Sequence, residues 1–173
     1  MLLYHTGFQK IRDPDIHYGR KNADFGQGFY MTDKKEFACR WAREQRGRQT
    51  ILNTYELNTD GLQICSFARD INWFEYIFAN QAGKPDTHPE ADLIIGPIAN
   101  DTIYDTFGII TSGLLEKEQS MQLLMIGPVY EQIVLKSEKA ARQLHWLESR
   151  VLQPEEIGKY RTLVAEEEAE YRK

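Results

Sequence analysis

The sequence predicts an α+β domain, because stretches with the features of strands are mixed along the chain with stretches of helical spacing. Residues 50–57 and 92–98 are rich in β-forming residues and are bounded by polar or turn-forming ones. In residues 70–80, apolar side chains recur every three or four positions, as they do on one face of a helix. These patterns together indicate at least one sheet with helices packed around it.

The first fifty residues are expected to pass from a strand through a loop into a helix. Residues 2–5 form a short apolar run that indicates a strand, and Thr6-Gly7 indicates a turn after it. The segment 13–15, Asp-Pro-Asp, is typical of a loop. From residue 34 to about 46, apolar residues take one side of a predicted helix and charged residues take the other.

The stretch 24–33, DFGQGFYMTD, joins this strand to this helix and is the centre of the sequence pattern. Gly26 and Gly28 can adopt positive φ or allow another group to approach the main chain closely. Asp33 and Glu36 have the spacing of a capping box, which predicts that Asp33 caps the following helix. A turn, a short strand and a helix start are therefore expected here.

The remaining elements follow from the same two periodicities. Strands are expected at 50–57, 92–98 and 129–135, and helices at 70–80, 102–110, 116–125, 137 to about 150 and from 154 onward. Pro97 lacks an N–H, so we expect it near an edge or an end of its strand.

Length and composition favour one soluble domain. A chain of 173 residues, 42% of them hydrophobic, can bury one core, so we expect a single domain over 1–173, with a core of about 1–150 and a charged helix over 151–173. No run approaches the roughly 20 apolar residues of a membrane span, and the N-terminus lacks the features of a signal peptide. Two isolated cysteines without metal-ligand spacing indicate a cytoplasmic protein with no metal site.

The charge is unevenly distributed along the chain. The net charge is −5, yet residues 1–50 carry ten Lys or Arg and only six Asp or Glu. An acidic protein with one basic region suits a small phosphate-bearing ligand better than broad nucleic-acid binding. The alternative is that the arginines at 40, 43, 46 and 48 form only a solvated helix face.

Three segments resemble the catalytic domains of poly(ADP-ribose) polymerases, in the ADP-ribosyltransferase superfamily. Phe25 to Asp33 resembles the segment F-G-x-G-[IF]-Y-F-A-D, and Leu2 to His5 resembles a first strand that ends in histidine. Glu131 to Leu135 resembles the late strand E-Y-I-V-Y. The whole chain is also similar to an uncharacterised bacterial family related to these enzymes, which shares the segments GR…DFG.GFY.T and IIGPIAND and is often encoded near toxin–antitoxin genes.

The resemblance implies a fold of two short antiparallel sheets in a split core, a bound NAD+ and specific residue roles. His5 would hydrogen-bond the nicotinamide ribose, and the Thr6 main chain would hold the carboxamide beside Gly7. Tyr30 and Trp41 would lie against the two faces of the nicotinamide ring. Arg20, Phe25, Gly26 and Gly28 are the further residues expected to bind NAD+.

Glu131 or Gln132 would polarise the ribose 2′-hydroxyl or activate the acceptor, and the sequence leaves the choice between the two residues open. A carboxylate there would stabilise the positive charge that develops when the N-glycosidic bond breaks. Neighbouring strand residues face opposite sides, so only one of the two reaches the site, and the alignment favours Glu131. The usual His-Gly-Ser/Thr is His5-Thr6-Gly7 here, and Ala38 stands where the polymerases have a serine.

The function implied is transfer of ADP-ribose from NAD+ to a macromolecule, with release of nicotinamide and without a metal. The protein would be the toxin of a pair with an antitoxin partner. One alternative is an NAD+ glycohydrolase, and another is a degenerate module that binds NAD+ or a protein without turnover. Each residue also has an ordinary structural interpretation: His5 bonded to a carbonyl, Tyr30 and Trp41 in the core, and Glu131 in solvent. Arg20, Asp24, Asp92 and Asp101 are polar loop residues that either line the same cleft or serve as caps and turns.

Overall fold

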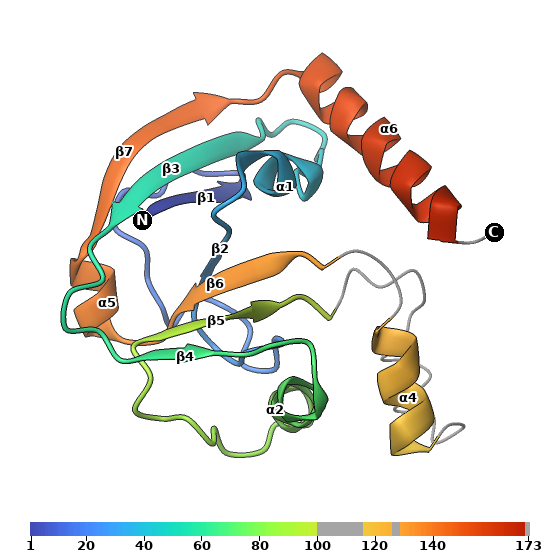
Figure 1. The fold of residues 1–173 in the computed structure, drawn as a ribbon. Helices are drawn as coiled ribbons and strands as arrows, with labels where there is room; N and C mark the ends of the chain where they lie inside the picture. Colours follow the sequence, from blue (N-terminus) through green and yellow to red (C-terminus); the bar gives the residue numbers. More distant parts are fainter. Residues whose placement is uncertain (100–115, 126–128, 172–173) are drawn as a thin grey trace.

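Two sheets, with helices around them, form the structure of the protein (Figure 1). The computed structural model describes residues 1–99, 116–125 and 129–171. One sheet is antiparallel, in the order β1 (Leu2–Gly7), β3 (Ile51–Leu57) and β7 (Leu144–Val151). The other has the order β2 (Phe29–Met31), β6 (Glu131–Leu135), β5 (Leu93–Pro97) and β4 (Ile64–Ser66). The helices are α1 (Lys35–Arg40), α2 (Ile71–Gln81), α4 (Lys117–Leu124), α5 (Glu138–Arg142) and α6 (Pro154–Tyr171).

A main-chain bridge joins the two sheets, between β1 and the residue that follows β2. Tyr4 and Thr32 exchange both main-chain hydrogen bonds there, at 2.8 and 3.0 Å, and form an isolated bridge. Tyr4 therefore directs its N–H and C=O away from β3. Main-chain groups alternate in direction along a strand, so the N–H and C=O of Thr6 point to the same side of β1 as those of Tyr4, away from β3. At Thr6, β1 is no longer paired with β2.

Buried apolar side chains form three clusters that tie these elements together. The cluster between the sheets includes Leu3, Met31, Tyr55, Ile133 and Leu135. The cluster between the second sheet and α2 includes Phe25, Trp73, Ile77, Ile94 and Val134. The cluster beneath α1 and α6 consists of Ala38, Cys39, Ala42, Leu52, Leu152 and Ile157. Strand β6 contributes to the first two of these clusters, which explains why its last three residues, 133–135, are all apolar.

Helix α2 follows the sequence prediction closely. The side chain of Asp70 accepts hydrogen bonds from the N–H groups of Asn72 and Trp73, so it satisfies two of the free donors at the helix start. Trp73 and Ile77, four residues apart, are both buried against the second sheet. The indole of Trp73 also donates to the carbonyl of Pro97 at 2.8 Å, and Pro97 is the last residue of β5.

The helix predicted from 137 to about 150 is wrong beyond its first turns. Helix α5 ends at Arg142, and β7 begins two residues later. The strand was hidden because its register shifts between Thr54 and Tyr55 of β3. Tyr55 pairs with Trp146 and Thr54 with Glu148, so Leu147 is an extra residue that breaks the period-two alternation.

The helix predicted over 34–46 is shorter, and its predicted cap is wrong. Helix α1 ends at Arg40, and its N-cap position is Lys34, with no side-chain hydrogen bond. Asp33 lies one residue too early to cap it and is exposed. The carbonyl of Lys34 starts the helix by accepting from Ala38 N–H.

Three other expectations for the fold meet different outcomes. Strand β4 was not predicted, and it runs parallel to β5, so the second sheet is mixed instead of antiparallel. The helix expected over 102–110 lies outside the described residues. The strands predicted at 2–5, 50–57, 92–98 and 129–135 and the helices predicted at 70–80, 116–125 and from 154 onward are present. Within the described ranges, no helix has both the length and the apolar character needed to cross a membrane.

Candidate functional site

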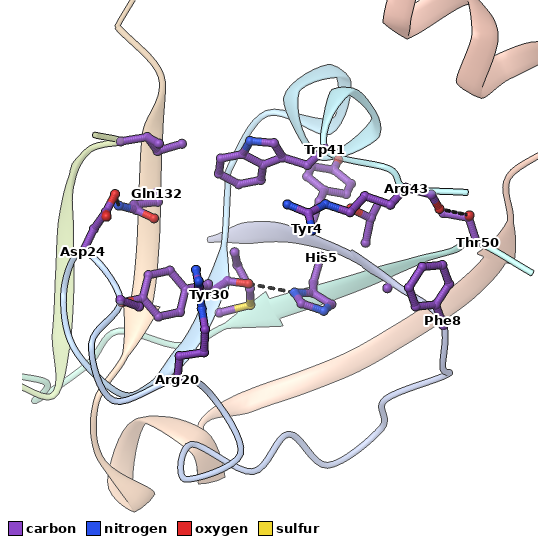
Figure 2. A pocket seen from close by; sticks show the side chains of 15 residues that line it. Tyr4, His5, Phe8, Arg20, Asp24, Tyr30, Trp41, Arg43, Thr50 and Gln132 are labelled. Carbon is purple, nitrogen blue, oxygen red and sulfur yellow. Dashed lines mark hydrogen bonds between the residues drawn. The ribbon is translucent and has the colours of Figure 1, made fainter. Parts of the chain in front are cut away.

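A pocket of about 410 Å³ opens at the junction of the two sheets (Figure 2). Its lining includes seven of the residues predicted to form a site: His5, Thr6, Gly7, Arg20, Tyr30, Trp41 and Gln132. They come from β1, the loop after it, β2, the end of α1 and β6. The split between the sheets therefore brings together residues that lie more than a hundred positions apart.

His5 is held in one orientation by the main chain of β2. Its Nδ1 lies 2.8 Å from the carbonyl oxygen of Tyr30. A carbonyl only accepts hydrogen bonds, so Nδ1 carries the proton and donates. Burial lowers the pKa of His5 below its ordinary value of 6.5, although the bond to Tyr30 opposes this effect. The neutral ring therefore keeps Nε2 as a hydrogen-bond acceptor.

Tyr30 contributes a fixed ring to the pocket. Its hydroxyl donates to the Gly26 carbonyl at 2.6 Å and accepts from the Phe25 N–H at 3.0 Å. Burial raises the pKa of Tyr30 well above its ordinary value of 10.0. The phenol thus stays protonated at neutral pH and serves to tie the loop 24–28 to β2.

The loop 24–28 supports the pocket mainly from outside it. Phe25 is fully buried against α2, and Lys136 Nζ donates to its carbonyl at 2.5 Å. Gly26 has φ of +71°, which favours glycine. A Cβ on Gly28 would lie 2.6 Å from the carbonyl oxygen of Leu135, so this glycine allows close packing on β6. Phe25, Gly26 and Gly28, expected to bind NAD+, do not line the pocket.

Trp41 stands on another side of the pocket, across from Tyr30 and His5 (Figure 2). Its ring packs against Phe37, with centroids 4.2 Å apart, and Phe37 in turn stacks on Tyr130 at the same separation. Arg40 Nη1 donates to the Tyr130 hydroxyl at 2.6 Å. These contacts join the end of α1 to the segment before β6 and fix where the indole lies.

Gln132, and not Glu131, lines the pocket. In the register of β6 and β5, Gly96 pairs with Gln132 and Pro97 pairs with Glu131. Gln132 is 4% exposed, whereas Glu131 is exposed and is not part of the lining. The alignment that favoured Glu131 therefore disagrees with the structure. The choice depends on strand register, which neighbouring strands determine.

Asp24 is a buried carboxylate in the pocket wall, with 3% exposure. Its Oδ2 accepts from Ala99 N–H at 3.0 Å and from Gln132 Nε2 at 3.3 Å. Its Oδ1 accepts from Gln81 Nε2 at 2.8 Å. Asp92, the other buried aspartate considered from the sequence, instead accepts from the Ser137 hydroxyl at 2.6 Å, away from the pocket. Asp101 lies outside the described residues.

Several lining residues were not predicted, and Arg43 is the most informative of them. Its side chain is exposed and reaches the pocket, while its carbonyl accepts from the Thr50 hydroxyl at 2.5 Å. The only signal in the sequence was the run of arginines from 40 to 48. The other unpredicted lining residues are Tyr4, Phe8, Ala23, Met31, Thr50 and Ile98.

Comparison with known protein families gives a match that covers most of the chain. A family model described as "Protein of unknown function (DUF3990)" matches residues 1–146. These residues include every residue that lines the pocket. No curated protein matches the chain.

Proposed function

Because the chain belongs to the DUF3990 family, whose description names no activity, we propose a function from its own site. The protein is an ADP-ribosyltransferase that binds NAD+ in the pocket between the sheets. It transfers ADP-ribose to a macromolecular acceptor and releases nicotinamide.

The observation that carries this proposal is the convergence of His5, Thr6, Tyr30 and Trp41 in one pocket. Two aromatic rings on different sides suit a flat ligand such as nicotinamide. The main-chain N–H and C=O of Thr6 turn toward the same region, and together they complement the oxygen and the amide group of a carboxamide. This combination of flat walls and a paired donor and acceptor favours nicotinamide over a purely apolar ligand.

His5 and the two arginines supply the remaining recognition. Nε2 of neutral His5 is a hydrogen-bond acceptor, and a ribose hydroxyl is a suitable donor to it. Arg20 and Arg43 line the pocket and give it positive charge beside Asp24, the one carboxylate among the described lining residues. Guanidinium groups pair well with phosphate oxygens, so these arginines suit the pyrophosphate of NAD+.

The chemistry requires one bond to break and another to form at the ribose. The bond between C1′ and the nicotinamide nitrogen breaks, and its electron pair leaves with nicotinamide, which becomes neutral. C1′ gains positive charge in the transition state, and the acceptor atom bonds to it and loses its proton. Rigid positioning of both partners and a negative charge near C1′ lower the barrier.

A second candidate function is favoured by Gln132. It lines the pocket with a neutral amide, whereas Glu131, the residue that the resemblance aligns with the acid, is exposed and outside the lining. A protein without that acid in its pocket would bind NAD+ there without breaking it. The two functions differ in a single measurable result, the release of nicotinamide.

Purified protein incubated with NAD+ separates these functions, with free nicotinamide followed by chromatography and binding followed by thermal shift. We expect release by the wild type and a loss of both signals in Trp41→Leu. Trp146→Leu is the matched control, because Trp146 belongs to β7 and is not part of the pocket lining. A thermal shift without nicotinamide release would support binding alone. The absence of both a thermal shift and release would contradict the proposal. Release without labelling of any macromolecule would indicate transfer to water.

A toxin role belongs to the same proposal and rests on the resemblance alone. Induced expression of the intact chain should then arrest growth of a bacterial host, and Trp41→Leu should relieve the arrest while Trp146→Leu does not. Normal growth with abundant folded wild-type protein would contradict the toxin role without touching the enzymatic one.

A further inference from the structure

The pocket contains a negative charge at Asp24, which the sequence left open as either a cleft residue or a cap. Of the described residues that line it, Asp24 alone carries a carboxylate. Glu131, on the same strand as Gln132, is exposed outside the lining. Among the described lining residues, electrostatic help from an acid to a positive transition state can therefore come only from Asp24.

The contact between Asp24 and Gln132 determines how the amide lies. The carboxylate can only accept, so Gln132 must direct Nε2 toward it, at 3.3 Å from Oδ2. The amide oxygen Oε1 then points away from Asp24, as Figure 2 shows. The structure thus presents a hydrogen-bond acceptor to the pocket, backed by a charged group.

Asp24 is held firmly enough to impose this orientation. Besides Gln132, the N–H of Ala99 and the amide of Gln81 donate to its carboxylate. Its own main-chain carbonyl accepts from Asn80 Nδ2 at 3.2 Å. Because α2 and the segment after β5 hold Asp24 from two directions, the carboxylate does not depend on Gln132 for its position.

We propose that Asp24 and Gln132 act as a pair that replaces the single acid expected at this site. Gln132 accepts a hydrogen bond from a ribose hydroxyl through Oε1, and Asp24 orients that amide and supplies the negative charge. Gln132 is the catalytic residue of the pair, and Asp24 is a positioning residue that acts through it. This inference rests on the proposed function, since it concerns how the same reaction is assisted.

The test exchanges the carboxylate at position 24 and the amide at position 132, and it measures kcat and KM for nicotinamide release. Asp24→Asn should lower kcat by roughly 100-fold, a typical effect of removing one electrostatic group, with little change in KM. Gln132→Glu alone should also be impaired, because it places two carboxylates together. The double variant Asp24→Asn/Gln132→Glu should recover most of kcat, since the amide introduced at position 24 can donate to a carboxylate that now faces the ligand directly.

Control variants separate this role from a structural one. Asp92→Asn changes another buried aspartate outside the pocket, and we expect its kcat to match the wild type. Gln132→Met keeps the side-chain length and removes the amide, so its kcat should fall. This variant still tests the pair if Asp24→Asn does not fold. An unchanged kcat in Asp24→Asn or in Gln132→Met would overturn the pairing, as would a folded double variant that shows no recovery.

The results also distinguish this inference from the proposed function. Nicotinamide release by the wild type, together with an unaffected Asp24→Asn, would overturn the pair and leave the transferase standing. A wild type that gives a thermal shift with NAD+ but no release would overturn both, and would leave a pocket that binds without turnover.

Discussion

Burial and one hydrogen bond together determine how His5 can act. The bond from Nδ1 to the Tyr30 carbonyl satisfies the ordinary structural interpretation of a histidine at the end of a strand. The same bond leaves Nε2 available as an acceptor at the pocket wall, so the structural and the ligand-binding interpretations do not exclude each other. Protonation of Nε2 would remove this acceptor and place a charge in a partly buried site.

Stability should therefore depend on the titration of His5. Its folded pKa lies below the ordinary 6.5, so the unfolded chain binds a proton first as the pH falls below that value. The contribution of His5 is complete above about pH 6.5 and is lost as the pH falls toward the folded pKa, with a slope of up to about 1.4 kcal/mol per pH unit. Urea unfolding at pH 7.5 and 5.5 measures this loss.

The matched variant for that experiment is His5→Asn, whose amide nitrogen can still donate to the Tyr30 carbonyl. It should lose less unfolding free energy between the two pH values than the wild type does. An equal loss in both proteins would show that other groups cause the pH dependence.

Arg43 should contribute to binding and little to turnover. Its exposed side chain reaches the pocket without a described ion pair, so Arg43→Gln should raise the Kd for NAD+ about 5- to 20-fold, as expected for the loss of one charge-assisted contact of about 1–2 kcal/mol. Arg46→Gln in the same exposed segment is the control, because Arg46 does not line the pocket. Equal affinities of the two variants, measured by calorimetry, would argue against a role for Arg43.

At the scale of the elements, the two helices predicted with most detail differ in how they begin. Helix α2 starts after Asp70, whose side chain caps it, whereas α1 starts without any side-chain cap. Helix α1 is held instead by packing, through Ala38 and Cys39 on the buried side and through Phe37 on Tyr130. The position of Trp41 at its end depends on these tertiary contacts.

Asp70→Ala should lower the free energy of unfolding by about 1 kcal/mol, since it removes the acceptor for two main-chain donors at the start of α2. Asp33→Ala is the matched control. The sequence pattern predicted Asp33 as the cap of α1, but its side chain does not cap that helix. This substitution should change the unfolding free energy by less than about 0.5 kcal/mol. Denaturant titration of both variants compares the real cap with the apparent one.

Local sequence patterns were sufficient to predict helices and strands that keep one periodicity throughout. They were insufficient where pairing with a neighbouring strand determines the conformation or the register. Strand β7 escaped prediction because Leu147 interrupts its alternation, and the three residues of β4 are too few to show a pattern. In the site, the resemblance of three segments to the polymerases implied a shared pocket for His5, Tyr30 and Trp41, and all three line the pocket. The choice between Glu131 and Gln132 needed the register with β5, and the role of Asp24 needed partners from α2 and β6.

For the molecule as a whole, α6 is an extension that packs at its start and extends into solvent. Ile157 is 3% exposed in the cluster beneath α1, and Arg161 forms an ion pair of 2.8 Å with Glu44. Leu163, less than two turns further along, is already 37% exposed. The first two turns therefore belong to the same folded unit as α1.

This arrangement predicts unequal effects of two similar truncations in α6. Ile157→Ala should lower the free energy of unfolding by about 2–4 kcal/mol, because it opens a cavity beneath α1. Leu163→Ala should cost less than about 1 kcal/mol, since its side chain already contacts water. Thermal unfolding of the two variants measures the difference, and equal losses would contradict this account of α6.

The three tryptophans lie in three different surroundings, which gives the protein a built-in optical reporter. Trp73 is fully buried, and Trp146 has the cationic groups of Lys10 and Arg12 over its ring at 4.3 and 4.8 Å. Trp41 alone of the three lines the pocket. In a Trp146→Phe background, fluorescence would come from one shielded indole and from the one at the pocket wall. A ligand that enters the pocket should therefore quench or shift the Trp41 component, which makes its binding visible without a label.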